Sequence, residues 1–112
     1  MQTLLNHFQL SANMKIEQLE KAWAEFGNHL LTQHLASQVS ELHRRIESSD
    51  FDTDEQRPHT HLAMIHFKDA AQAARAWKAI EENTEPLAGL HREVMRLVKA
   101  PEFTFWDSSG DK

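Results

Sequence analysis

The chain has 112 residues, a net charge of -5, eight histidines and no cysteine. This length corresponds to a single domain, residues 1–112, that can bury a core without stabilisation by metal ions or disulfide bonds. The lack of cysteine excludes disulfides, thiolate metal sites and cysteine nucleophiles. The acidic balance argues against nucleic acid and anionic membranes as partners, because both need clustered Lys and Arg.

The first ten residues do not look like a targeting segment. They carry neither a basic start nor a long apolar run. No window approaches the ~18 consecutive apolar residues that a membrane span requires. We therefore expect a cytoplasmic protein.

The first half of the chain predicts a strand, a helix and an edge strand. Residues 4–10 are short and apolar-rich, which favours a strand. Apolar residues then recur at three- and four-residue steps from Met14 to about His34, which is typical of an amphipathic helix, with Asn13 as its N-cap. The stripe of this helix is Ile16, Leu19, Trp23, Phe26 and Leu30. Residues 38–48 alternate and predict a charged edge strand. One side of that strand carries Val39, Glu41, His43 and Arg45.

The middle of the chain predicts a loop, a central strand and a second helix. Residues 48–58 are polar and acidic, which indicates a loop. Residues 60–68 are apolar on both faces, which indicates a strand buried on both sides. Asp69 is the expected N-cap of a helix that ends near Asn83. Its core stripe is Ala70, Ala73, Ala74, Trp77 and Ile80.

The end of the chain predicts a third helix and a last strand. Pro86 is tolerated in a first helical turn, and Pro101 ends the helix shortly after Leu97. Residues 103–106 predict a short strand, and residues 108–112 a polar tail. The whole order is βαββαβ with the second helix split in two, which is the ferredoxin-like α+β class. Right-handed crossovers would place the first and third strands side by side and parallel, with all helices on one face of an antiparallel sheet.

One face of this sheet is expected to lie open. The helix side takes Leu4, Phe8, Leu10, Leu42, Ile46, Ala63, Ile65, Phe67, Phe103 and Phe105. The open side takes Leu5, His7, Gln9, Glu41, His43, Arg45, Leu62, Met64, His66, Thr104 and Trp106. Its apolar members form a patch that a monomer rarely leaves in water, so we expect a homodimer with two sheets packed face to face.

Three stretches of the sequence resemble a known superfamily. They are Leu42-His43-Arg44-Arg45, the run from Ala63 to Asp69, and Gly89-Leu90-His91 continuing through Val94 to Val98 and Phe103. These stretches are similar to the dimeric α+β barrel superfamily, which includes antibiotic-biosynthesis-type monooxygenases, muconolactone isomerases and stress-responsive barrel proteins. Within it they look most like an uncharacterised bacterial domain family. The resemblance implies a homodimer and a small-molecule cavity between sheet and helices.

Three histidines are the main candidates for chemistry. Strand alternation places His7, His43 and His66 on the open face of the first three strands. His7 and His66 could act as catalytic acids or bases, because imidazole titrates near neutral pH. The three imidazoles could instead hold a metal together with Glu41, or serve as hydrogen-bonded interface residues.

A ligand site on the same face is expected to be lined by His43, Glu41, Arg45, Met64 and Trp106. Arg45 could hold an anionic group, or it could protect an exposed sheet edge. Trp106, with Met64 beside it, could form an apolar wall for a flat ligand or pack in the dimer. The neighbouring pair His59 and His61 has the pattern of exposed turn histidines.

The sequence leaves three functions open. The first is a homodimeric barrel that binds a small aromatic or apolar molecule and acts on it without a cofactor. The second is a non-catalytic binding or regulatory module, and the third is a metal-binding protein. The sequence has no glycine-rich phosphate loop and no nucleophile elbow, so we expect no nucleotide cofactor.

Overall fold

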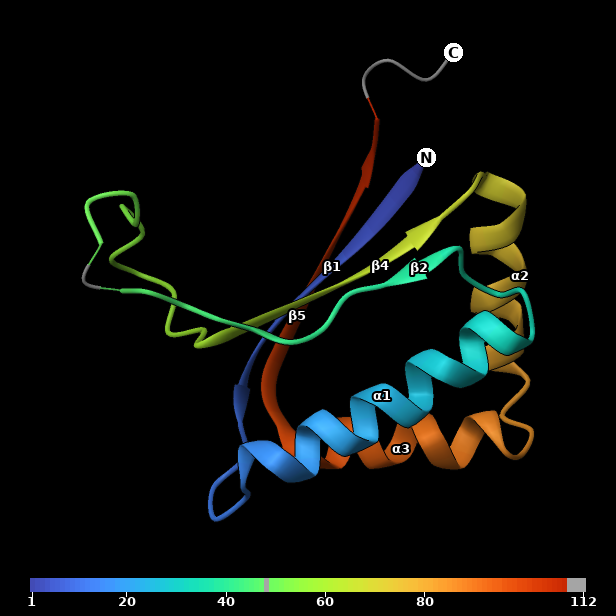
Figure 1. Ribbon diagram of the computed structural model, residues 1–112, viewed down its shortest axis with the longest axis horizontal. Coiled ribbons are helices and arrows are strands. Elements are labelled where there is room, and N and C mark those ends of the chain that lie inside the picture. The colour runs from blue at the N-terminus through green and yellow to red at the C-terminus, as the bar shows by residue number, and fades with distance from the viewer. Residues whose placement is uncertain (48, 109–112) are drawn as a thin grey trace.

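The computed structural model describes residues 1–47 and 49–108. In these residues one sheet is covered on one face by three helices (Figure 1). The strands are β1 (Gln2–Leu10), β2 (Gln38–Val39), β3 (His43–Arg44), β4 (His61–Phe67) and β5 (Val98–Asp107). The helices are α1 (Ile16–Thr32), α2 (Ala70–Glu81) and α3 (Leu87–Leu97). The expected order of elements and the position of the helices are confirmed. Residues 109–112 of the predicted tail lie outside the described residues.

The sheet has the order β2-β4-β1-β5, with β3 also beside β4. The neighbours β1 and β4 are antiparallel, and Leu5 lies opposite Met64. The expectation that the first and third strands are parallel was wrong. The α1 crossover makes the first and second strands parallel, and the return through residues 45–60 then reverses the third.

The core lies between α1 and the helix side of the sheet. The predicted α1 stripe is buried at four of its five positions, namely Leu19, Trp23, Phe26 and Leu30. They pack with Phe8, Ala63, Ile65 and Phe67 of β1 and β4. The start of α1 differs from the prediction. Asn13 adopts a left-handed turn conformation (φ 65°), and the N-cap is Lys15, whose backbone N–H donates to Gln18.

The predicted edge strand is broken by one extra residue. Val39 lies opposite Ile65, and His43 lies opposite Leu62. Four residue steps along the edge strand therefore span the same length as three steps along β4. Ser40 lies at the break, where its hydroxyl accepts the N–H of Met64. The bulge turns Val39 to the helix side, so its expected place beside Glu41 and His43 was wrong.

Four aromatic or aliphatic side chains predicted to be buried are exposed, and Phe103 on β5 is one of them, at 51% exposed. Ile46 is 67% exposed because the chain leaves the sheet there, and Trp77 is 64% exposed. Phe105 lies on the helix side, opposite Leu4, but is 53% exposed because β5 is an edge strand that α1 does not cover. The last strand also begins earlier than predicted, because Ala100 (φ 51°) and Pro101 form a bulge inside β5 rather than a stop.

Gly27 marks the closest approach of α1 to the edge strand. A Cβ at this position would lie 2.9 Å from Cγ1 of Val39. We expect Gly27→Ala to lower the free energy of unfolding by about 1 kcal/mol, because the overpacking outweighs the gain in helix propensity. Gly89→Ala is the control, since its Cβ would meet only the ends of two flexible side chains, Glu85 and Arg92. Urea unfolding of both variants checks this, and equal stability changes would contradict it.

No helix in the described part of the chain is long and apolar enough to span a membrane.

Candidate functional site

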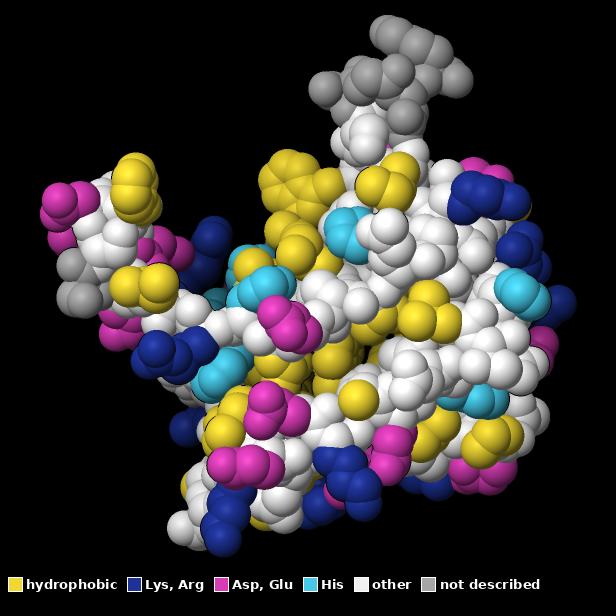
Figure 2. Space-filling view, in the orientation of Figure 1, with side chains coloured by type: hydrophobic (Ala, Val, Ile, Leu, Met, Phe, Trp, Pro, Cys, Tyr) yellow, Lys and Arg dark blue, Asp and Glu magenta, His cyan; other side chains and the backbone are white. Residues whose placement is uncertain are grey.

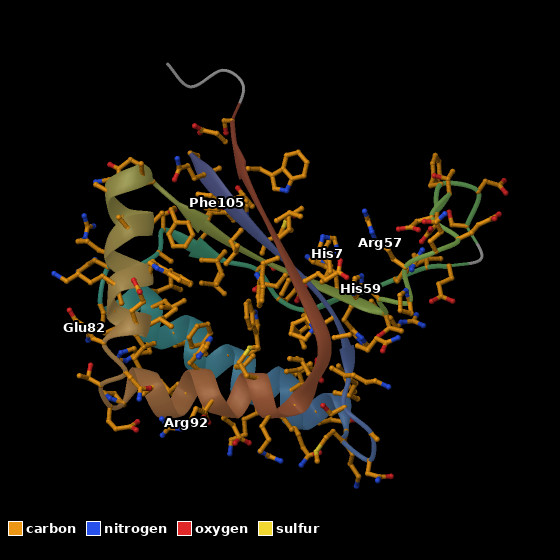
Figure 3. All side chains as sticks on the ribbon, turned by 180° about the vertical axis from the view of Figure 1, so that it is seen from behind. His7, Arg57, His59, Glu82, Arg92 and Phe105 are labelled. Carbon is orange, nitrogen blue, oxygen red and sulfur yellow. The ribbon has the colours of Figure 1, made fainter. Side chains whose placement is uncertain are left out.

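The larger of two candidate sites lies between α2 and one end of the sheet; we call it the apolar pocket. It has a volume of about 480 Å³. Its walls are Gln2, Leu4, Leu30, Ile65, Phe67, Ala70, Ala73, Ala74, Ala76, Trp77, Ile80 and Phe105. Figure 3 shows Phe105 on β5, facing the side where α2 lies.

The apolar pocket exists because α2 presents small side chains to the sheet. Four alanines on this helix fill little of the space, while Phe67 and Phe105 form the opposite wall in edge-to-face contact, 6.2 Å apart. Trp77 and Phe105, both more than half exposed, lie at its rim. The volume and the apolar lining fall within the range of small-molecule sites.

The lining of the apolar pocket offers no group for acid–base or nucleophilic chemistry. Among its twelve lining residues, all in the described part of the chain, Gln2 is the one polar side chain. An amide can orient a ligand through a hydrogen bond, but it neither donates nor accepts a proton near neutral pH. The arrangement therefore suits binding rather than catalysis.

The second candidate site lies on the open face of the sheet; we call it the histidine pocket. Its volume is about 280 Å³. It is lined by His7, His43, Arg44, Arg45, Asp52, Asp54, Arg57, His59, His61 and Leu62. His7 of β1 and His43 of β3 flank Leu62 of β4 in one row of the sheet, as alternation predicted. The other wall comes from the segment 45–60, which projects from the sheet in Figure 1.

Arg45 organises that wall. Its guanidinium donates to both carboxylate oxygens of Asp52, and to the carbonyl oxygens of Asp54, Arg57 and His59. The hydrogen bond from Arg45 lowers the pKa of Asp52 to about 2. The Arg45 guanidinium therefore fixes the conformation of the backbone between Asp52 and His59. The expected role of Arg45 in binding a ligand stays a prediction.

His59 is a residue that the sequence analysis missed. It was expected to be exposed, but its side chain is only 7% exposed. Its ring lies 5.7 Å from that of His7, and its Nε2 lies 3.3 Å from the carbonyl oxygen of Ala100 (Figure 3). The segment carrying it is held over the sheet by Gln9, whose amide donates to the carbonyl of Pro58. His61 is also partly buried, because its ring stacks on Phe8.

His7 has an altered proton affinity. Burial lowers its pKa below 6.5, and the neighbouring His59 and Arg57 lower it further, while Glu102 opposes the shift. An imidazole with a lowered pKa is neutral at pH 7 and can accept a proton. The sequence pattern could not predict these surroundings of His7, because His59 and Arg57 lie some fifty residues away and reach His7 only through the fold.

His66 does not join the other two histidines. It lies on the same open face, but its Nδ1 is 2.9 Å from Oγ1 of Thr3, its neighbour on β1. It lies four residue steps along β4 from Leu62, a distance of about 13 Å. Within residues 1–47 and 49–108, no three His, Asp or Glu side chains are grouped so that they could hold a metal ion.

The remaining predicted site residues are spread over the molecule. Glu41 lines a groove between α1 and the edge segment, away from the histidines; the apolar floor of this groove is visible in Figure 2. Met64 and Trp106 do lie on the open face, and Trp106 donates its indole N–H to the hydroxyl of Thr104. Trp106 is 58% exposed. Their roles in ligand binding stay predictions.

Comparisons with known proteins relate the chain to others by structure and not by sequence. No family model and no curated protein matches the sequence. Protein At3g17210 from Arabidopsis thaliana has a similar structure, with a TM-score of 0.75 at 6% identity over 100% of this chain and 99% of that one. A hydroxynitrile lyase from Passiflora edulis has a TM-score of 0.61 at 12% identity over 99% and 95%.

A third similar structure carries a description of its fold. It is a dimeric protein of unknown function and ferredoxin-like fold from Bacteroides fragilis, with a TM-score of 0.56 at 8% identity over 96% of this chain and 95% of that one. Identities this low establish the fold alone. The chain is therefore a mixed α+β protein with the ferredoxin-like fold of these structures.

Proposed function

We propose that the protein is a homodimer that binds a small aromatic or apolar molecule in the apolar pocket. The observation that carries this proposal is the lining of that pocket, in which one amide is surrounded by aliphatic and aromatic side chains. Ligand sites are commonly concave and mostly apolar, with few polar groups that set orientation. The superfamily that the sequence resembles also has its cavity between sheet and helices.

The same lining argues that this pocket binds a molecule without catalysing a reaction on it. Catalysis needs a group that reacts or moves a proton at the bound molecule, and the lining holds neither a carboxylate, an imidazole nor a hydroxyl. One similar structure is a hydroxynitrile lyase, so the fold is compatible with an enzyme. In this chain the titratable groups lie in the histidine pocket instead.

A matched pair of substitutions on α2 tests the proposal. Ala74 and Ala71 are both exposed alanines of this helix, and only Ala74 lines the apolar pocket. Ala74→Phe should weaken the binding of the neutral dye N-phenyl-1-naphthylamine at least about tenfold by filling the pocket, whereas Ala71→Phe should leave it unchanged. Dye fluorescence measures both. A wild-type protein without saturable binding, or equal effects of the two changes, would contradict the proposal.

The open face of the sheet is the proposed dimer interface. Its apolar members Leu5, Leu62, Met64 and Trp106 lie on β1, β4 and β5, on the side away from the helices. A second copy packed on this face would remove them from water. The similar structure from Bacteroides fragilis is described as dimeric. A monomer in light scattering at micromolar concentration would overturn this part of the proposal.

A second candidate function is proton transfer by His7 in the histidine pocket. The observation that favours it is the lowered pKa of this partly buried imidazole, which leaves it as a base at neutral pH. His66, the other expected catalytic residue, would act only on a ligand that reaches along the sheet. An NMR titration that gave His7 a pKa of 6.5 or above would contradict this candidate.

A further inference from the structure

Basic side chains of this acidic chain gather around the histidine pocket. The chain has a net charge of -5, yet the pocket is lined by three arginines, four histidines and two aspartates. A local concentration of one sign of charge in a concave site raises the potential there and attracts ions of the opposite sign.

Of the three arginines that line the pocket, Arg45 forms a tight pair with a carboxylate, whereas Arg57 is only loosely paired and Arg44 lies outside both pairs. Arg45 and Asp52 neutralise each other through two hydrogen bonds. Asp54 uses its Oδ1 to accept the backbone N–H groups of Gln56 and Arg57. In the described part of the chain the Arg57 guanidinium makes no hydrogen bond, and its nearest carboxylate oxygen, of Asp54, is 3.6 Å away.

Arg57 lies beside two imidazoles. The rings of His7 and His59 are 5.7 Å apart, and Figure 3 shows both close to Arg57 where the segment 45–60 leaves the sheet. The electrostatic influence of Arg57 on His7 is consistent with this proximity. All three side chains line the same pocket, where a guanidinium and two imidazoles can offer N–H donors to the oxygen atoms of a small oxyanion.

We infer that the histidine pocket binds the phosphate or carboxylate group of a small metabolite, held by Arg57, His7 and His59. The volume of about 280 Å³ admits such a group with a few further atoms. Glu102 is the competing anion, since its carboxylate lies 3.9 Å from Nε2 of His59 on the exposed side of β5. The site is separate from the apolar pocket and does not rest on ligand binding there, but Leu62 of its lining also belongs to the proposed dimer interface.

Titration of labelled protein with inorganic phosphate, and separately with acetate, tests this inference by NMR at constant pH and ionic strength. At least one anion should shift the imidazole signals of His7 and His59 in a saturable manner. Saturation by phosphate alone assigns a phosphoryl group, and saturation by acetate alone assigns a carboxylate. If neither anion saturates these signals, the inference is wrong.

Two arginine variants distinguish anion binding at a specific site from a general effect of the protein's charge. Arg57→Ala should weaken anion binding at least about tenfold. Arg92→Ala removes the same charge from a similarly exposed arginine on α3, far from the pocket (Figure 3), and should leave the affinity unchanged. Equal losses in both variants would overturn the inference. Glu102→Gln should tighten binding, and weaker binding in this variant would also count against the site.

Discussion

Replacing Leu97 with alanine should lower the free energy of unfolding by about 3 kcal/mol, the largest stability effect that we expect from one substitution. Leu97 is 0% exposed and is the last residue of α3, directly before β5. It belongs to the core cluster that joins the helices to the sheet. Its removal leaves a cavity that the chain cannot easily close, because helix and strand are continuous at this point.

An exposed leucine is the control for this prediction. Leu31 on α1 is 37% exposed, so Leu31→Ala should cost less than about 1 kcal/mol. Urea unfolding followed by circular dichroism measures both variants. Equal losses would show that Leu97 is not in a well-packed core.

Placing a charge at Met64 should separate the proposed dimer. Met64 lies in the middle of β4 on the open face, with Leu5 directly opposite on β1. A carboxylate at this position would lie buried and unpaired between two sheets, so Met64→Asp should raise the dissociation constant at least about 100-fold. The substitution leaves the helix-side core untouched, because Met64 points away from it.

Sedimentation velocity at micromolar concentration measures this effect. The wild type should sediment at twice the monomer mass of 13.0 kDa, and Met64→Asp at the monomer mass. Leu31→Asp, which adds the same charge to an exposed position on α1, should remain dimeric. A dimer that survives Met64→Asp but not Leu31→Asp would place the interface on the helices instead.

The regular elements could be predicted because their side chains repeat with the period of the backbone. The strand around residues 61–67 and the stripe of α1 each bury one face, so a shift of one residue would expose that face. The histidines His7 and His43 fell in one row for the same reason. Where the pairing between neighbouring strands is unbroken, local alternation is enough to predict the face on which each side chain lies.

The edge of the sheet and both pockets could not be predicted in this way. One extra residue near Ser40 reverses the alternation, and only its contacts with Trp23 and Met64 reveal it. Trp77 carries the periodicity of a core residue, but it is more than half exposed at the rim of the apolar pocket. His59 is buried by hydrogen bonds that Gln9 and Arg45 make to its own segment. Such contacts join distant parts of the chain and produce no periodic pattern in the sequence.

The location of a bound apolar molecule is the sharpest test of ligand binding in the apolar pocket. Intermolecular NOEs between the labelled protein and indole, used as a small aromatic probe, identify the side chains that the probe touches. We expect NOEs to methyl groups of Ala73, Ala74 and Ile80 in the apolar pocket. NOEs confined to Leu5, Leu62 and Met64 on the open face of the sheet would contradict it.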